Sequence, residues 1–303
     1  MGEKFKVLVL YYSQTGKTKS LLDIFLEPLQ KRSDVEITIE EILPKVPFPF
    51  PWPQLYFFSL VPECVYEVPI ELQEMKFNEN EKYDLIILGY QVWFLAPSIP
   101  TNSLLKHPKA KVFANTPVVS VLFCRNMWRQ AQGRLERRLE ELQSWVVDKV
   151  VTTAYGSQME TLRSTKQNLL QKPKIGEDSH QWRPSPEDVE ITKKQGIQLA
   201  DSIWQIKENP KRPIFKDSSR ALKDTMFVYP EQKAKESFFA WGGYFLKHSS
   251  TESTKRKIFI ILFCWTFFFK VFVLLPLFPI LKKLREKAGK NNSEIKILDI
   301  PSL

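Results

Sequence analysis

The residues best suited to chemistry lie near the N-terminus, in the run from Ser13 to Thr18. An apolar stretch from Val7 to Tyr12 precedes this run, and a helical pattern follows it. Backbone N–H groups at the start of a helix point outward, and the helix dipole favours an anion there. Ser and Thr hydroxyls add donors without adding positive charge. We therefore predict a site for a phosphate monoester, with an ordinary Ser/Thr helix cap as the alternative. The residues of this loop are Ser13, Gln14, Thr15, Gly16, Lys17 and Thr18.

Two nucleotide-binding patterns are missing from this run. An ATP- or GTP-binding loop needs a glycine five residues before Gly16, where the chain has Tyr11. The dinucleotide pattern Gly-x-Gly-x-x-Gly is also absent, because Gly16 is the only glycine of the turn. The spacing Ser-x-Thr-Gly-x-Thr instead resembles the phosphate loop of flavodoxins, which cradles the phosphate of FMN. The resemblance implies FMN as the cofactor.

A second loop follows the apolar run from Asp84 to Gly89. In flavodoxin-like proteins the corresponding loop begins with Gly and carries an aromatic ring that covers one face of the flavin. By this resemblance Gly89 and Trp93 are cofactor-binding positions, with Tyr90 and Phe94 as competing aromatics. Trp suits such stacking because its ring is flat and electron-rich. An aromatic plug in the core is the alternative for Trp93.

A third loop follows the apolar run from Thr116 to Phe123. Flavodoxins usually have small or Gly-rich residues here, so this chain departs from their pattern. We expect Cys124, Arg125 and Asn126 to contact the cofactor. The charge of Arg125 would lie near flavin N1, where negative charge develops on reduction. A surface arginine at a helix start is the alternative, and the sequence names no general base.

These loops need a scaffold that gathers the carboxyl ends of parallel strands. Short apolar or alternating runs predict strands, and apolar residues at helical spacing predict helices. Their alternation predicts an α/β domain over residues 1–206, with a flavodoxin-like, doubly wound, five-stranded parallel sheet. The predicted strands are Val7–Tyr12, Val35–Ile39, Asp84–Gly89, Thr116–Phe123 and Val146–Thr153, and the predicted helices are Leu21–Leu29, Leu135–Trp145 and Pro186–Ile206.

Residues 44–69, which we call the proline–aromatic segment, do not fit a minimal domain of this kind. Alternating prolines forbid a helix and disfavour a strand, so we expect a stiff extended loop. Its aromatic side chains suit a lid over the sheet edge or an apolar wall for a hydrophobic ligand, and the two interpretations are compatible. The prolines are Pro47, Pro49, Pro51 and Pro53, and the aromatics are Phe48, Phe50, Trp52, Tyr56, Phe57 and Phe58.

The C-terminal part contains a second unusual segment, Ile258–Leu281, which is apolar apart from Lys270 and a threonine and has basic clusters at both ends. We predict that residues 257–288 associate with a membrane, dipping into one leaflet between anionic head groups. A basic linker at 207–256 precedes them, and a tail at 289–303 follows. The segment is also long enough for a full span, and a buried core helix is the remaining alternative.

The formal net charge of +10 is concentrated after residue 206, which indicates an anionic surface as partner. No zinc-finger spacing or RNA-binding signature is present, so we expect no nucleic acid partner. Cys64, Cys124 and Cys264 are widely spaced, which argues against a disulfide framework or a metal site and favours a reducing compartment. The N-terminus has no cleavable signal pattern. We expect a cytoplasmic location, peripheral to or anchored at the inner membrane through the C-terminal segment.

Residues 4–206 resemble the flavodoxin-like superfamily. A closer resemblance is to a bacterial family named dialkylresorcinol condensing enzyme, carried by VLVLYYSQTGKT, by PFPFPW followed by FF and VPECV, and by CRNMW at Cys124–Trp128. It implies a role beside a ketosynthase in making dialkylresorcinol lipids. The chain lacks the Cys-His-His arrangement of a ketosynthase, whereas a flavin fold fits the aromatising step, in which a dialkyl cyclohexane-1,3-dione loses two hydrogens.

Three hypotheses for function follow. The first is an FMN-dependent oxidoreductase acting on a lipophilic ring substrate. The second is a membrane-associated NAD(P)H:quinone-type flavin reductase that uses the same loops. The third is a non-catalytic flavodoxin-fold scaffold, which the unusual third loop favours. Electron-carrier flavodoxins tend to be acidic, so the basic character of this chain favours an enzyme with its own substrate.

Overall fold

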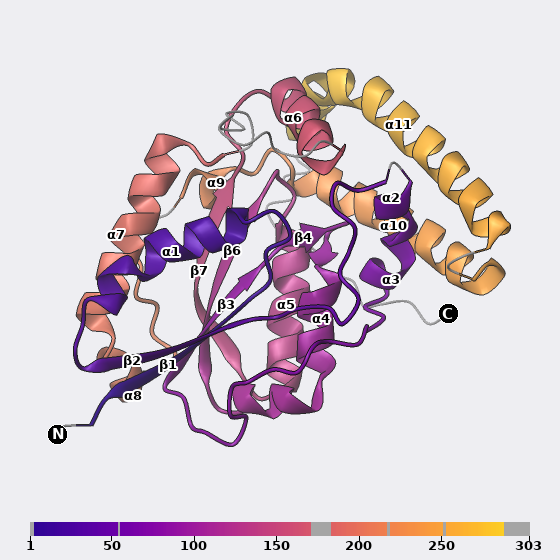
Figure 1. Cartoon of the computed structure of the whole chain (residues 1–303). Coiled ribbons are helices and arrows are strands. Elements are labelled where there is room, and N and C mark those ends of the chain that lie inside the picture. The colour runs from indigo at the N-terminus through magenta and orange to yellow at the C-terminus, as the bar shows by residue number, and fades with distance from the viewer. Residues whose placement is uncertain (1–2, 54, 171–182, 217–218, 251–252, 288–303) are drawn as a thin grey trace.

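The computed structural model describes residues 3–53, 55–170, 183–216, 219–250 and 253–287. Within these residues the centre is a five-stranded parallel sheet with the strand order β2-β1-β3-β6-β7 (Figure 1). This is the 2-1-3-4-5 order of the flavodoxin-like fold, with its reversal between β1 and β3. The predicted fold class is therefore confirmed. The strands are β1 Phe5–Tyr11, β2 Val35–Glu41, β3 Leu85–Tyr90, β6 Pro117–Cys124 and β7 Trp145–Thr153.

Alternation along the strands sends side chains into two separate apolar cores. In β1, Leu8 and Leu10 pack on one face of the sheet, and Val7 and Val9 pack on the other. Helices α1 (Lys17–Gln30) and α7 (Pro186–Ser202) cover the second face. Helices α4 (Ile99–Lys106) and α5 (Arg129–Glu141) cover the first. Both faces are buried, which explains why the central strands read as continuous apolar runs.

Two predicted helices have different bounds in the structure. The helix predicted at Leu135–Trp145 is α5, which begins at Arg129 and ends at Glu141. Trp145 instead opens β7, where its indole N–H donates to the carbonyl oxygen of Pro210 at 2.6 Å. The helix predicted to run to Ile206 ends at Ser202, and α8 (Gln205–Glu208) follows.

The prediction of a purely extended proline–aromatic segment was wrong beyond Pro53. Two short helices follow, α2 (Tyr56–Ser59) and α3 (Val61–Val65). Pro62 is compatible with α3 because it lies in the first turn, where its missing N–H would have no helical partner.

Other elements connect the main ones. A short hairpin of β4 (Val92–Trp93) and β5 (Ala96–Pro97) follows β3. A 3₁₀ helix spans Pro108–Phe113, α6 spans Gln158–Leu170 and α9 spans Arg220–Lys223.

The region expected to be a basic linker is largely helical. Helix α10 spans Val228–His248 and buries Phe238, Phe239 and Phe245. Helix α11 spans Thr254–Lys287 and packs against α10 and α2. Figure 1 shows α11 along the outer edge of the molecule, with α10 and α2 beneath it. The tail at 289–303 lies outside the described residues.

Among the helices of the described residues, none combines the length and the apolar character that crossing a membrane requires.

Gly196 lets α7 approach α1 closely, and this generates a stability prediction. A Cβ at this position would clash with the carbonyl oxygen of Phe25. Gly196→Ala should therefore lower the free energy of unfolding by about 1–3 kcal/mol, although Ala usually stabilises a helix interior by about 0.5–1 kcal/mol. Urea unfolding measures the change. Ile197→Ala, at the exposed neighbouring position, should change stability by about 0.5 kcal/mol or less; equal effects at the two positions would contradict the packing role.

Candidate functional site

The loops that follow β1 and β3 meet at the carboxyl edge of the sheet. The backbone N–H of Gln14 donates to Gln91 Oε1 at 3.4 Å, and Gln14 Nε2 donates to the carbonyl oxygen of Phe48 at 3.4 Å. The rings of Tyr12 and Trp93 lie 5.8 Å apart. The structure therefore brings the first two predicted loops together and adds the proline–aromatic segment to them.

Residues Ser13–Thr18, which we call the phosphate loop after its predicted ligand, have the backbone that their sequence requires. Gly16 has a φ of 76°, in the left-handed region that favours glycine, and α1 begins directly after it. Among the described residues, no heavy atom beyond those of the neighbouring backbone lies within 4 Å of the position that a Cβ would take at Gly16. The Ser13 hydroxyl accepts the N–H of Lys19 at 3.2 Å, so this residue also caps α1. The loop thus combines an open glycine with the N-terminus of a 14-residue helix.

Two threonine hydroxyls of the loop are buried without a partner among the residues that the structure describes. They are Thr15 Oγ1 and Thr18 Oγ1, and the whole Thr18 side chain is buried. A buried polar group without a hydrogen bond costs about 1–3 kcal/mol, and such groups are uncommon in native proteins. Phosphate oxygens would accept hydrogen bonds from both hydroxyls. The loop therefore fits the phosphate end of FMN.

Trp93 lies inside a cluster of aromatic rings. Its exposed fraction is 6 %, and the other members surround it with ring centroids 5.4–6.0 Å from its own. This arrangement is that of an aromatic plug. A role in covering the flavin stays a prediction, and it requires the cluster to open. The members of this aromatic cluster are Tyr12, Phe48, Trp52, Phe57 and Trp93.

Gly89 and Tyr90 have packing roles in the structure. A Cβ at Gly89 would clash with the Leu22 side chain, so glycine allows α1 to lie close to β3. Tyr90 is completely buried, and its hydroxyl donates to Gln132 Oε1 on α5 at 2.8 Å. These contacts fasten α1 and α5 to opposite faces of the sheet. A contact of either residue with a cofactor stays a prediction.

The third loop lies at the carboxyl ends of β6 and β7. Arg125 Nε donates to Thr161 Oγ1 on α6 at 3.3 Å. Burial lowers the pKa of Arg125 to about 10, so the guanidinium stays charged at neutral pH. The Cys124 thiol donates to the carbonyl oxygen of Asn126 at 3.7 Å. Burial raises the pKa of Cys124, which makes it a poor nucleophile. Contacts of Cys124, Arg125 and Asn126 with a flavin stay predictions.

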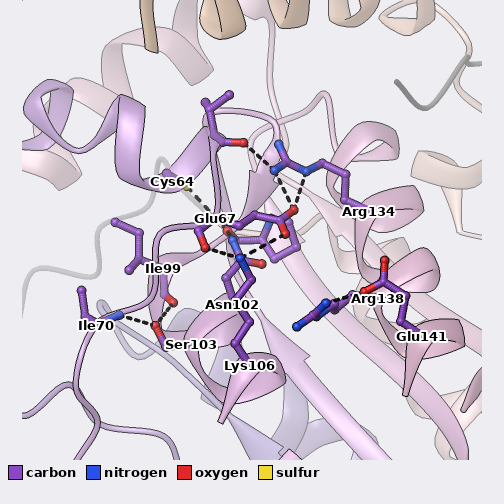
Figure 2. Close-up of polar contacts among 12 residues, drawn as sticks. Cys64, Glu67, Ile70, Ile99, Asn102, Ser103, Lys106, Arg134, Arg138 and Glu141 are labelled. Atoms are coloured by element: carbon purple, nitrogen blue, oxygen red, sulfur yellow. Dashed lines mark hydrogen bonds and ion pairs between the residues drawn. The ribbon is translucent and has the colours of Figure 1, made fainter. Parts of the chain in front are cut away.

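A buried ion pair holds the proline–aromatic segment against α5 (Figure 2). Arg134 is 5 % exposed; its Nη2 lies 2.6 Å from Glu67 Oε1 and donates to the carbonyl oxygen of Val65 at 2.5 Å. Lys106 on α4 donates to the carbonyl oxygen of Glu67 at 2.5 Å. The Cys64 thiol donates to the carbonyl oxygen of Trp93 at 3.1 Å. These contacts fix the segment that supplies Phe48, Trp52 and Phe57 to the aromatic cluster.

A second buried arginine holds the same segment from the side of α11. Arg256 is 1 % exposed, and its Nη1 donates to Glu63 Oε1 at 3.1 Å and to the carbonyl oxygen of Ser59 at 3.3 Å. Sequence reasoning missed Glu63 and Glu67, and the only signal was two acidic residues four positions apart in an apolar run. Within the described part of the chain, no group of three or more His, Cys, Asp or Glu side chains is placed to hold a metal ion.

Removing the buried cation should destabilise the whole site. Arg134→Met leaves the Glu67 carboxylate with only the more distant cation of Lys106, whose Nζ lies 3.9 Å from Oε2. We therefore expect the free energy of unfolding to fall by about 3–5 kcal/mol. Adding Glu67→Gln to Arg134→Met should recover part of this loss. The control is Lys19→Ala, which breaks the exposed pair with Asp23 and should cost about 0.5 kcal/mol or less. Denaturant unfolding of the three variants measures the changes in stability. A loss of unfolding free energy in Arg134→Met as small as that in Lys19→Ala would contradict a stabilising role for the buried ion pair.

Comparisons with known proteins give likenesses of fold only. No family model matches the chain, and no curated protein matches it. A flavoprotein from Lactobacillus acidophilus NCFM, crystallised with FMN, is 21% identical over 48% of this chain and 91% of its own, with a TM-score of 0.39. A flavodoxin from the domain Archaea is 12% identical over 66% of this chain and 99% of its own, with a TM-score of 0.36. An oxidoreductase from Corynebacterium diphtheriae is 10% identical over 67% of this chain and 99% of its own, with a TM-score of 0.38. The fold assignment therefore rests on the strand order of the sheet itself.

Proposed function

We propose that this chain is an FMN-binding oxidoreductase. The observation that carries the proposal is the pair of buried hydroxyls of Thr15 and Thr18, which have no hydrogen-bond partner in the described part of the chain, beside the open Gly16 and the start of α1. A phosphate monoester would satisfy both hydroxyls and would gain from the helix dipole. The switch point between β1 and β3, where flavodoxin-like folds place FMN, lies at this loop.

When bound, FMN supplies a group that accepts or donates a hydride. The chain's own residues hold and enclose it. The Ser13–Thr18 loop would hold the phosphate, and the aromatic cluster, once open, would shield the reacting ring from water. The hydroxyl of Tyr12 donates to Gln14 Oε1, which ties the cluster to the phosphate loop. Burial raises the pKa of Tyr12, so it remains a neutral donor at physiological pH.

We further propose that the substrate is a lipophilic ring compound. The support is an uninterrupted series of aromatic contacts from the loop toward α11, with centroid separations near 6 Å. Trp93 contacts Phe57 at 6.0 Å, Phe57 contacts Phe58 at 5.8 Å, and Phe58 contacts Phe268 on α11 at 5.8 Å. Oxidation of a dialkyl cyclohexane-1,3-dione to a dialkylresorcinol, beside a ketosynthase, is a reaction that suits such surroundings.

The FMN proposal is tested by direct binding. Thr15→Val and Thr18→Val remove one donor each while keeping shape, and each should weaken FMN binding about tenfold or more, because a hydrogen bond to a charged group contributes about 1.5–3 kcal/mol. Quenching of FMN fluorescence measures the affinity. Thr38→Val on β2, away from the loop, is the matched control. Wild-type protein that takes up no FMN, or a control that loses as much affinity, would contradict the proposal.

A second experiment separates the candidate activities once FMN is bound. Under anaerobic conditions NADPH should bleach the flavin rapidly, and a quinone should restore it, only if the chain is a quinone-type reductase. A cyclic 1,3-dione should bleach it only if the chain aromatises ring substrates. FMN binding with neither response would leave the scaffold hypothesis.

We also propose that α11 docks on a membrane surface. Its exposed apolar residues recur every three or four positions, which places them on one face of the helix over about 39 Å. Exposed lysines 255, 257 and 270 lie on the same helix, which suits anionic head groups. Leu55, beside α2, lines an open apolar groove with this face. The apolar residues are Ile258, Ile261, Leu262, Trp265, Phe269, Val273, Leu277, Ile280 and Leu284.

Vesicle binding tests this surface. The double variant Trp265→Glu with Phe269→Glu should reduce binding to anionic phospholipid vesicles by at least about tenfold, because burying one large apolar side chain contributes about 1.5–3 kcal/mol. Cosedimentation with the vesicles measures the binding, and added salt should weaken binding of the wild-type protein. Ile197→Glu, at an exposed apolar residue on α7, is the control and should bind like wild type. Unchanged binding of the double variant would exclude this face.

A further inference from the structure

A pocket separate from the phosphate loop lies at the carboxyl ends of β6 and β7, and none of its lining residues belongs to that loop. Its walls come from the loop after β6, the start of α5, the first turn of α6, α9 and the first turn of α10. Three of the lining residues are arginines and two are carboxylic acids. We call it the arginine pocket, after Arg125, Arg129 and Arg220; the acids are Asp224 and Glu231.

Arg129 and Arg220 donate hydrogen bonds to uncharged oxygens. Arg129 Nη2 donates to the carbonyl oxygens of Leu222 at 3.0 Å and Asp224 at 2.7 Å, and its guanidinium lies 4.7 Å from the Trp128 ring centroid. Arg220 Nη2 donates to Thr153 Oγ1 at 3.1 Å. Fixed guanidinium groups are well suited to oxyanions, because their N–H groups form a rigid fork.

Arg220 is also close to a buried acid, but the two do not form a hydrogen bond through Nε. Arg220 Nε lies 3.7 Å from Asp188 Oδ2, and both atoms are buried without a hydrogen-bond partner among the described residues. Asp188 itself is completely buried. The ion pair therefore holds Arg220 at the pocket and leaves Nε without an acceptor.

Glu231 forms the most deeply buried wall of the pocket. It is 1 % exposed, and its Oε1 accepts the N–H of Gln130 at 2.6 Å, in the first turn of α5. Its carboxylate thus occupies a helix N-terminus, where anions are favoured. Burial raises the pKa of Glu231 to about 7, although the N–H of Gln130 and the charges of Arg129 and Lys235 oppose this rise.

We infer that the arginine pocket binds an oxyanion, a phosphate or carboxylate group of a ligand, and that Glu231 controls its affinity through its own charge. An ionised Glu231 repels a second anion, while a protonated Glu231 leaves the arginines to face the ligand. Falling pH through about 7 removes this negative charge, so affinity should rise as pH falls. The charged groups facing Glu231 are Arg129 on α5 and Lys235 on α10, and the titratable Cys124 on β6 and Tyr90 on β3 also face it. The pocket adds Arg125, Arg220 and Asp224.

Sulfate is the probe, because it keeps the same charge below and above pH 7. It is titrated against chloride at equal ionic strength, with thermal stability and calorimetry as readouts. Arg125→Gln and Arg220→Gln should each weaken sulfate binding about tenfold. Arg212→Gln, at an exposed arginine outside the pocket, is the control and should bind like wild type. The Arg220→Gln variant loses the ion pair with Asp188 and could unfold for that reason. In that case sulfate binding by Arg220→Lys and Arg125→Gln tests the pocket.

The Glu231→Gln variant tests the charge control directly. It should bind sulfate equally well on both sides of pH 7, whereas wild type should bind more tightly on the acidic side. Pocket variants that bind sulfate like wild type, or a pH dependence that survives Glu231→Gln, would overturn the inference.

The phosphate loop is a competing place for sulfate, so the titration is repeated on the variant with both Thr15→Val and Thr18→Val. This variant should keep the pocket's sulfate response, including its pH dependence. Failure of FMN binding and failure of the arginine pocket are therefore independent results. Comparison of NADPH, NADH and acetate then identifies the source of the anion: preference for NADPH indicates a nucleotide phosphate, and competition by acetate indicates a carboxylate.

Discussion

The buried Arg134–Glu67 ion pair is the interaction on which the candidate site depends. Alternating prolines remove the backbone N–H groups that pairing in a sheet needs, so the described part of the proline–aromatic segment forms an isolated bridge, Pro44 with Leu72, but no strand. The proline–aromatic segment is therefore fixed from outside, by Arg134 on one side and by Arg256 with Glu63 on the other. Both arginines are almost completely buried, so their carboxylate partners offset a large desolvation cost. The aromatic cluster keeps its position over the phosphate loop because this segment is fixed.

The carboxyl edge of the sheet is divided into two chemical environments. At β1 the loop offers uncharged hydroxyls, backbone N–H groups and an open glycine, while at β6 and β7 the pocket offers guanidinium groups around a buried carboxyl. The aromatic contacts of Trp93, in the hairpin that follows β3, continue to α11. The edge therefore offers uncharged donors after β1 and fixed cations after β6 and β7, two environments that suit different groups of a ligand.

Local patterns predicted the features that depend on neighbouring residues. Buried parallel strands appear as short apolar runs, and the turn at Gly16 with a helix directly after it is encoded by residues 13–18 alone. Both were therefore predictable, while binding of a phosphate by this loop stays a prediction. The missed features depend on residues far apart in sequence: Glu231 accepts from Gln130 across 101 positions, and Arg134 meets Glu67 across 67. Helix α3 was missed for a local reason. The prolines of the segment predict that no helix forms, but Pro62 lies in the first turn of α3, where proline is tolerated. Trp93 fits both a flavin contact and a core plug, so its sequence position alone does not choose between them.

The aromatic cluster also gives the protein an optical property. The chain has eight tryptophans, and two of them, Trp52 and Trp93, lie in the cluster with ring centroids 5.6 Å apart. Both are nearly inaccessible to solvent, at 3 % and 6 % exposure. Their emission therefore comes from an apolar environment and is sensitive to any rearrangement of the rings around the phosphate loop. The molecule thus contains an intrinsic fluorescent reporter at its candidate site, and opening of the cluster becomes visible without an attached dye.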